Sequence, residues 1–570
     1  MAAADSNDSV LSRAASGATF LLIGTILQRL LTFAMNTALI RSTHADVLGF
    51  AGHDMELLLS SILFLAREGV RLTALRNDFK VASTETQSLV NLSWCVLPVG
   101  AALAVAASLV FGSQTTTQQE LFTVVLFAAA AVLECAVEPM YIVVMGTLQM
   151  AVRVRAEAAA AFAKTVITTL CVLRFELGAP AFAMGQAAYA VILVAVYVWW
   201  ATTSGSPVRF TPAWLPPAEK CGAAGGPDDS DADSGALARF VLWKHLRLGG
   251  SFAGQGTLKH VLSEGDRMLL SAGATRGEKG AYNVVSSLGS LAPRLLFQPI
   301  EDASRNLFGI MAHSAATQPT GKGKGKHTPE AWLALCLTLR SVALVGMLFM
   351  FLGPPFTQVL VKMLLSPEWA ASVVPSALAV FCVYVATMAV NGITEAFVFA
   401  VVNEGDLAKL NARLVVISLL YSAAAWVCLK TYGVPGLIAA ASLNMAMRSA
   451  NSMWFIRRYF FRQYAFRVKW SHALPSWLTL LTAAAAGALC HGMGLYWGLH
   501  PASSAPRFTS HAGLPLLFYV FFGVVAAGIV LGAVYAHEAE HLRNAVDLLK
   551  AARGGDHREL KKRMGGVKVE

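Results

Sequence analysis

Long apolar runs alternate with short polar segments along almost the whole of this 570-residue chain. A helix of about 20 apolar residues can cross a bilayer, because it rises roughly 1.5 Å per residue through a hydrocarbon core roughly 30 Å thick. The pattern predicts an all-α polytopic membrane protein with about fourteen transmembrane helices. They are expected at about 14–40, 49–75, 87–111, 121–145, 152–173, 179–201, 249–272, 280–300, 331–352, 373–401, 411–429, 434–456, 473–495 and 514–536.

Three stretches depart from a simple apolar pattern. The seventh and eighth predicted spans, 249–272 and 280–300, are polar enough that a sliding hydropathy window would miss both. The stretch 353–365 contains Pro354 and Pro355. Because proline interrupts a helix, this stretch is expected to be a short interfacial or re-entrant piece.

The polar segments between the spans predict how the chain is organised. The longest contains Pro-Pro, Gly-Gly and four aspartates between Asp228 and Asp233, a composition typical of a disordered linker. It is expected to separate two six-helix halves. The predicted parts are an N-lobe at 1–201, a cytoplasmic linker at 202–247, a C-lobe at 248–456, two extra C-terminal spans within 457–536 and a basic cytoplasmic tail at 537–570.

Composition and charge support a membrane protein. The chain is 56% hydrophobic and only 14% charged, whereas soluble domains are about 25% charged. Its net charge of +11 does not indicate nucleic-acid binding, because the basic residues concentrate in short loops on one side when successive spans alternate. This asymmetry predicts that both termini are cytoplasmic. The first 13 residues have no apolar core and no cleavage site, so no signal peptide is expected.

Motifs for metal or nucleotide binding are not found in the sequence. The eight cysteines lie singly, without C-x-x-C or a Cys/His cluster, so neither a metal site nor a disulfide framework is expected. The Gly/Lys stretch from Gly321 to Lys326 lacks the Walker spacing and a following Ser or Thr. The sequence therefore predicts no cofactor and no ATP-driven step.

Many charged residues fall inside the predicted spans, where each costs roughly 2.5–3.5 kcal/mol at a helix centre. The basic ones are Arg29, Arg67, Arg71, Lys164, Lys259, Arg267, Arg294, Arg340 and Arg448. The acidic ones include Glu68, Glu134, Glu138, Glu264 and Glu395. An intramembrane charge is a functional hypothesis by default, so this set predicts a transporter.

Helical spacing aligns these residues with other polar side chains. In the eighth span one polar face is predicted from residues three or four apart: Asn283, Ser287, Ser290, Arg294, Gln298 and Glu301. Other spans pair Arg29 with Asn36, Asn391 with Glu395, and Asn444 with Arg448. Pro139, after Glu134 and Glu138, should kink the fourth span.

Two interpretations of the polar faces remain open. Polar side chains hold helices together in lipid, and Glu134 and Glu138 could neutralise Arg67 and Arg71 in this way. Alternatively, the excess of basic residues lines a water-filled cavity that receives an anionic substrate, and arginine suits bidentate contact with phosphate. The number of such residues in both halves favours the cavity.

Five motifs carry a resemblance to the eukaryotic Rft family. They are Phe64-Leu-Ala-Arg-Glu68, Leu262-Ser-Glu-Gly-Asp-Arg267, Leu288-Gly-Ser-Leu-Ala-Pro-Arg-Leu-Leu-Phe-Gln-Pro-Ile-Glu301, Asn391-Gly-Ile-Thr-Glu395 and Asn444-Met-Ala-Met-Arg448. The resemblance implies the fold of the multidrug/oligosaccharidyl-lipid/polysaccharide flippases, with two pseudo-symmetric six-helix lobes, here followed by two C-terminal helices. It also implies a mannose-rich oligosaccharide on dolichyl pyrophosphate as substrate. It also implies the endoplasmic reticulum membrane and a role in protein N-glycosylation.

The resulting hypothesis is a flippase that moves this glycolipid from the cytosolic to the luminal leaflet, without enzymatic activity and most simply as a monomer. The expected substrate-binding residues are Arg29, Asn36, Arg67, Lys259, Asn283, Arg294, Gln298, Asn391, Asn444 and Arg448. The residues expected in ion coupling or in structural ion pairs are Glu68, Arg71, Glu134, Glu138, Lys164, Glu264, Arg267, Glu301 and Glu395.

Three alternatives compete with the flippase. One is a scaffold or accessory factor in the assembly of the lipid-linked oligosaccharide. Another is a cation-coupled exporter of small molecules with the same fold, although a basic cavity suits cationic drugs poorly. A glycosyltransferase is disfavoured because the first luminal loop, about 41–49, is too short to carry catalytic acids.

Overall fold

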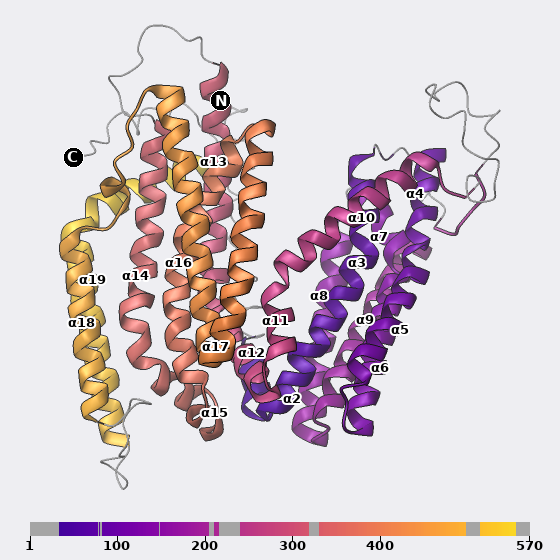
Figure 1. Cartoon of the computed structure of the whole chain (residues 1–570), viewed down its shortest axis with the longest axis horizontal. Helices are drawn as coiled ribbons and strands as arrows, with labels where there is room; N and C mark the ends of the chain where they lie inside the picture. The colour runs from indigo at the N-terminus through magenta and orange to yellow at the C-terminus, as the bar shows by residue number, and fades with distance from the viewer. Residues whose placement is uncertain are drawn as a thin grey trace, which may run out of the picture. The chain divides into compact units, whose positions relative to one another are not determined.

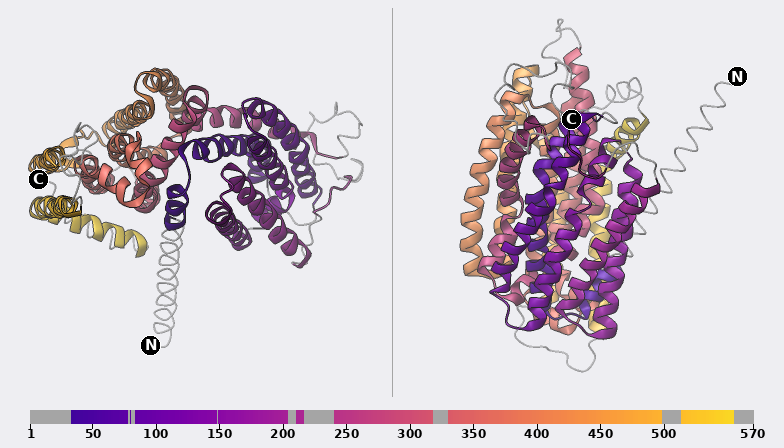
Figure 2. Two further views of the ribbon diagram at one scale, coloured as in Figure 1. Left: turned by 90° about the horizontal axis from the view of Figure 1, so that it is seen from below. Right: turned by 90° about the vertical axis from the view of Figure 1, so that its right-hand side faces the viewer.

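The computed structural model describes residues 33–77, 79, 83–147, 149–203, 210–215, 240–317, 330–497 and 513–554. Every regular element within these ranges is a helix, as the apolar pattern predicted. The chain forms two compact units, Met1–Met268 and Leu269–Glu570. Each unit is a bundle in which long helices run side by side (Figures 1 and 2).

The first unit begins, in its described part, with a helix at 33–41. Its further elements are α2 (Ala45–Gly49), the π-helix η1 (Phe50–Asp54), α3 (Met55–Arg76), α4 (Thr84–Trp94), α5 (Val96–Gly112), α6 (Gln118–Cys135), α7 (Glu138–Gly146), α8 (Met150–Phe175), α9 (Ala179–Thr203) and α10 (Trp243–Ser263). Helix α11 (Gly265–Gly273) follows at the boundary between the units.

The second unit contains the remaining helices. They are α12 (Arg276–Gly289), the π-helix η4 (Pro293–Phe297), α13 (Gln298–Thr317), α14 (Glu330–Leu364), α15 (Pro367–Ala371), α16 (Val374–Val401), α17 (Glu404–Tyr464), the 3-10 helix η5 (Trp470–Ala473), α18 (Trp477–Tyr496) and α19 (Gly513–Gly554).

Ten helical segments in the described part of the chain are long and apolar enough to cross a membrane. One of them, Gly405–Tyr464, covers both the eleventh and the twelfth predicted spans. The polar helices α10 and α12 are not among the ten, as expected for the seventh and eighth spans. Most of the first predicted span lies outside the described residues, and the count of fourteen stays a prediction.

The fourth span is broken where Pro139 predicted a kink. Helix α6 ends at Cys135, and α7 begins at Glu138 with the proline in its first turn. Proline is favoured there because its missing N–H needs no helical acceptor in the first turn.

The expectation of a separate interfacial or re-entrant piece at 353–365 is wrong. Helix α14 continues through Pro354 and Pro355 to Leu364. Pro355 has no N–H for the carbonyl of Phe351, and Gly487 of α18 lies so close that an added Cβ would stand 2.4 Å from that oxygen. Tyr519 of α19 also donates a hydrogen bond, at 2.9 Å, to the carbonyl of Pro355. Packing against the two C-terminal helices therefore lets the helix continue past both prolines.

Helix α17 consists of two arms that reverse direction at Gly433. This residue has φ 61° and ψ −145°, a backbone conformation that is essentially restricted to glycine. Pro435 comes two residues later and starts the second arm, so the predicted gap between 429 and 434 is a tight turn. Both ends of α17 consequently lie at the same end of the second unit, beside α16 (Figure 1).

Replacing Gly433 should destabilise this turn. We expect Gly433→Ala to cost about 1–3 kcal/mol, because a Cβ is strained at this φ and ψ, and to lower the thermal unfolding midpoint of the purified protein in detergent. The matched control is Gly528→Ala in α19, where an added Cβ meets open space. An equal midpoint for both variants would contradict the role assigned to Gly433.

Candidate functional site

Four charged side chains form a compact cluster in the first unit. Arg71 of α3 donates to both oxygens of Glu138, with Nε 2.5 Å from Oε1 and Nη2 2.9 Å from Oε2. Arg67, one helical turn earlier, lies 3.4 Å from Glu138 and 3.4 Å from Glu134. Two cations and two carboxylates make a group without net charge, which greatly reduces the cost of placing it among apolar helices.

Glu134 and Glu138 lie on either side of the break between α6 and α7, and both reach α3. Glu134 is in the last turn of α6 and Glu138 is the first residue of α7. Further contacts fix the cluster: Gln186 of α9 donates to Glu134 at 2.7 Å, and the guanidinium of Arg71 lies over the ring of Tyr141 at 3.9 Å. Beside the cluster is a cavity of only about 70 Å³, too small for a sugar or a pyrophosphate.

A second ion pair joins α16 and α17 in the other unit. Arg448 donates to both oxygens of Glu395, at 2.8 and 3.0 Å, in the fork geometry that suits arginine and a carboxylate. Asn391, one turn before Glu395, accepts a bond of 3.4 Å from Ser449. Asn444 is 9% exposed, and its buried side-chain oxygen has no hydrogen-bond partner within the described structure.

Five of the other charged residues singled out by the sequence are also paired. Lys164 lies 2.6 Å from Glu56, and Arg340 of α14 lies 2.6 Å from Glu538 of α19. The remaining two pairs are between neighbouring turns: Arg267 with Glu264 at 3.1 Å, and Arg305 with Glu301 at 2.8 Å. These ion pairs neutralise most of the described cations that lie within the predicted spans.

Other candidate residues lie on more open surfaces or outside the described part. Arg29 is outside the described residues, and so is the side chain of Lys259 in α10. Arg294 and Gln298 are exposed, and Asn36, Asn283 and Glu68 are half-buried. The eight expected substrate-binding residues whose side chains the structure describes do not line one common described pocket.

The continuous polar helix expected at 283–301 is interrupted. Helix α12 ends at Gly289, a π-helical turn occupies Pro293–Phe297, and α13 starts at Gln298. The helix at 283–301 is therefore not α-helical throughout, because a π-turn inserts an extra residue and rotates the helix beyond it; the continuous polar face stays a prediction. Such turns are frequent at functional sites, and this one falls within the longest of the five sequence motifs.

An apolar pocket lies beside this π-turn, inside the second unit. Its volume is about 440 Å³, and its wall includes Leu291 and Leu295 together with Phe349 and Phe356 of α14 and Phe381 of α16. A pocket so poor in polar groups is suited to hydrocarbon rather than to a sugar or a phosphate.

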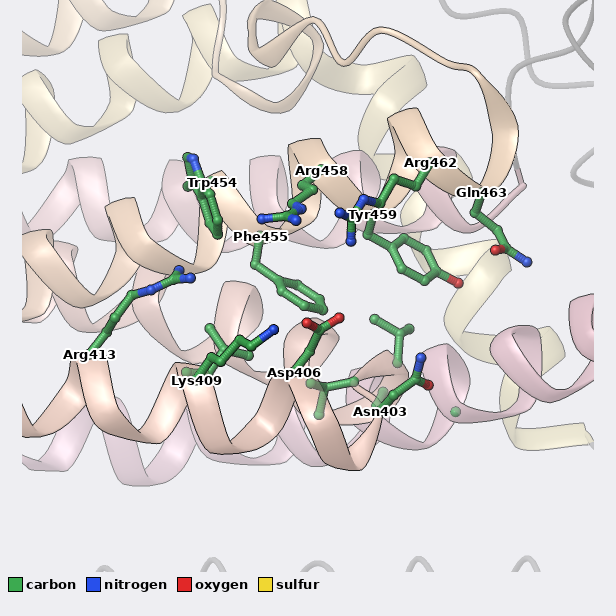
Figure 3. Close-up of a pocket in the computed structure, with 15 residues that line it drawn as sticks. Asn403, Asp406, Lys409, Arg413, Trp454, Phe455, Arg458, Tyr459, Arg462 and Gln463 are labelled. Carbon is green, nitrogen blue, oxygen red and sulfur yellow. The ribbon is translucent and has the colours of Figure 1, made fainter.

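A pocket that carries an excess of positive charge was missed by the sequence analysis. It has a volume of about 580 Å³ and lies where the two ends of α17 meet the end of α16 (Figure 3). We call it the basic pocket, after its four cationic lining residues: Lys409, Arg413, Arg458 and Arg462. The sequence signal for this pocket was a pair of basic residues four positions apart in each arm of α17. In the sequence these charges were used only to predict the membrane topology.

Comparison with solved structures places the fold among membrane transporters. Lipid II flippase MurJ in an inward closed conformation is similar over 91% of this chain and 99% of its own, with a TM-score of 0.54 and 9% identity. An inward-facing multidrug resistance MATE family transporter is similar over 77% of this chain and 96% of its own, with a TM-score of 0.50 and 12% identity. The chain therefore shares the fold of these two proteins, and its long apolar helices make it a polytopic membrane protein.

The particular family follows from the sequence. The family model described as Rft protein matches residues 13–548, so the chain belongs to the Rft family. The Man(5)GlcNAc(2)-PP-dolichol translocation protein RFT1 of Yarrowia lipolytica is 27% identical over 83% of this chain and 74% of its own length. The protein of the same name in Mus musculus is 27% identical over 79% of this chain and 83% of its own.

The Arg448–Glu395 pair can be tested with a double-mutant cycle. Removing either partner should cost on the order of 2 kcal/mol, between the values for exposed and fully buried pairs, because it leaves an uncompensated charge. We expect Arg448→Gln/Glu395→Gln to lose less than the sum of the single variants, measured as thermal unfolding midpoints in detergent. The control cycle uses the half-exposed i,i+4 pair Arg153 and Glu157, for which a coupling of no more than about 0.5 kcal/mol is expected. Additive losses at Arg448 and Glu395 would contradict a strong pair.

Proposed function

We propose that this protein translocates a dolichyl-pyrophosphate-linked, mannose-rich oligosaccharide from the cytosolic to the luminal leaflet of the endoplasmic reticulum membrane. The observation that carries the proposal is membership of the Rft family along nearly the whole chain, together with relatives named as Man(5)GlcNAc(2)-PP-dolichol translocation proteins. The fold shared with a lipid II flippase supports it, because that protein's name also describes the movement of a lipid. In this proposal the chain transports and does not catalyse.

The ion pairs suggest how substrate binding is coupled to protonation of the protein. The guanidinium of Arg448 is already held by Glu395, and that of Arg67 by Glu134 and Glu138. A pyrophosphate would therefore have to compete with a carboxylate for the arginine. Protonation of the displaced carboxylate would avoid leaving an unpaired negative charge in a low-dielectric environment. Glu395, Glu264 and the Glu134/Glu138 pair are accordingly the proposed coupling groups.

The remaining predicted substrate-binding residues are proposed from the chemistry of their side chains. Exposed Arg294, within the π-turn, and exposed Gln298, directly after it, would contact phosphate and sugar hydroxyls respectively. Asn391, Asn444, Asn283 and Asn36 would contact further hydroxyls. The apolar pocket beside the π-turn would shield hydrocarbon of the isoprenoid chain.

A second function is favoured by the same ion pairs. Because the described arginines Arg67, Arg71 and Arg448 already have carboxylate partners, a phosphate gains less from binding them than from binding unpaired cations. A non-transporting accessory factor in the assembly of the glycolipid needs no such exchange.

Reconstitution separates the two functions. Vesicles containing the purified full-length chain should transfer labelled Man(5)GlcNAc(2)-PP-dolichol between leaflets at least tenfold faster than protein-free vesicles, and Arg448→Gln should remove most of this gain. The control Arg153→Gln, in a half-exposed pair, should keep it. If the vesicles show no acceleration while the same protein restores N-glycosylation in cells depleted of their own Rft protein, the accessory role replaces transport.

The orientation in the membrane is proposed from the distribution of basic residues, with both termini and the linker at 202–247 in the cytoplasm. It predicts that an Asn-x-Thr acceptor inserted at 498–512 becomes glycosylated, and that one inserted at 318–329 does not. A gel-mobility shift removed by endoglycosidase measures this. The opposite pattern would invert the proposed topology.

A further inference from the structure

The walls of the basic pocket are formed by α17, α16 and α13. Because α17 reverses at Gly433, its first turns (Asn403–Arg413) and its last turns (Trp454–Gln463) lie opposite one another. Residues 400–402 at the end of α16 and Gly309 of α13 complete the wall. All of these elements belong to the second unit, and the pocket holds about 580 Å³.

The charge of the pocket is strongly unbalanced. Four lining residues are cationic and Asp406 is the acidic one among them. Figure 3 shows Lys409 and Asp406 reaching from the first arm, and Arg458 and Arg462 from the second, into the space between them. Each arm carries its two cations four residues apart, which places them on one face of the helix.

These cations differ from the paired ones elsewhere in the described structure. Lys409, Arg458 and Arg462 form no ion pair with a described carboxylate, not even with Asp406. Arg413 bonds the neutral side chain of Asn451 at 3.3 Å and lies over the ring of Trp454 at 4.3 Å. The pocket therefore presents N–H donors that an incoming anion can occupy without displacing a carboxylate.

The position of the pocket indicates a ligand from the membrane surface. It lies at the ends of membrane-crossing helices, and its aromatic lining residues Trp454 and Tyr459 are of the types enriched at bilayer interfaces. By the distribution of basic residues, this end faces the cytoplasm. Basic pockets between helix ends on that side of a membrane are suited to the phosphate groups of anionic lipids.

We propose that the basic pocket binds the phosphate-bearing headgroup of a lipid in the cytosolic leaflet. An anionic phospholipid and an isoprenoid pyrophosphate present the same chemistry, with phosphate oxygens beside an apolar tail. Arg458, Arg462 and Lys409 hold the phosphate, while the tail remains in the bilayer next to α13 and α16. The site does not depend on the proposed translocation, because it uses none of the residues assigned to that function.

Binding by the purified full-length chain in detergent tests the proposal. The probes are dioctanoyl phosphatidylinositol 4-phosphate, farnesyl pyrophosphate and inorganic pyrophosphate, and the readout is the dissociation constant from thermophoresis. We expect saturable binding of a lipid probe, at least tenfold weaker for Arg458→Gln/Arg462→Gln. Tighter binding of farnesyl pyrophosphate assigns the site to an isoprenoid lipid, and tighter binding of the inositol lipid assigns it to a phospholipid. Equal affinity for inorganic pyrophosphate would overturn a lipid site.

Matched variants separate the pocket from general surface charge. Arg457→Gln/Arg467→Gln removes the same charge from exposed positions that do not line the pocket, and it should leave affinity within twofold. Gly309→Leu changes no charge but projects a side chain where an added Cβ meets open space, and it should weaken lipid binding severalfold. Asp406→Asn should strengthen it.

Two outcomes contradict the proposal. Equal weakening by the pocket pair and the surface pair would indicate non-specific attraction to a basic surface. Unchanged affinity in both Gly309→Leu and Arg458→Gln/Arg462→Gln would place binding elsewhere. Elution as a single species and an unchanged unfolding midpoint establish that each variant is folded.

Discussion

Compensation of charge in a low-dielectric environment is the constraint on which the helix packing of this protein depends. An isolated arginine within apolar helices is unfavourable by several kcal/mol, so its partner must be brought from another helix. Arg71 meets Glu138, Arg448 meets Glu395, and Arg340 meets Glu538. Each of these pairs joins two different helices, so ion pairing also fixes which helices are neighbours and how they are rotated.

Several of these charged groups lie beside irregularities in the helices. Glu134 and Glu138 stand on either side of the break before Pro139, and the reversal at Gly433 brings the two ends of α17 together. The π-turn at Pro293–Phe297 rotates the residues C-terminal to it. Without these local departures, a straight helix would present its polar residues along one fixed stripe. The charged cluster of the first unit lies beside such a departure, and the basic pocket of the second unit depends on another.

Two kinds of charged environment result. In the first, arginines are saturated by carboxylates and a ligand must compete for them; Arg67 and Arg448 belong here. In the second, at the helix ends, Lys409 and Arg458 line an open pocket without described carboxylate partners. The first environment suits structural stabilisation or a coupled exchange, and the second suits direct capture of an anion. A protein that handles a phosphate-bearing lipid can use both.

The sequence by itself determined the helical membrane class, the positions of most spans and the break at Pro139, because apolar length and proline chemistry are local properties. Its motifs also indicated the Rft family. It could not decide whether Arg67 was paired or free, since Glu134 and Glu138 are 67 or more residues away along the chain. It missed the basic pocket and wrongly interrupted α14 at Pro354. Only the tertiary structure decided these points, because they depend on contacts between helices: the opposing arms of α17, and the packing of α18 and α19 beside the prolines.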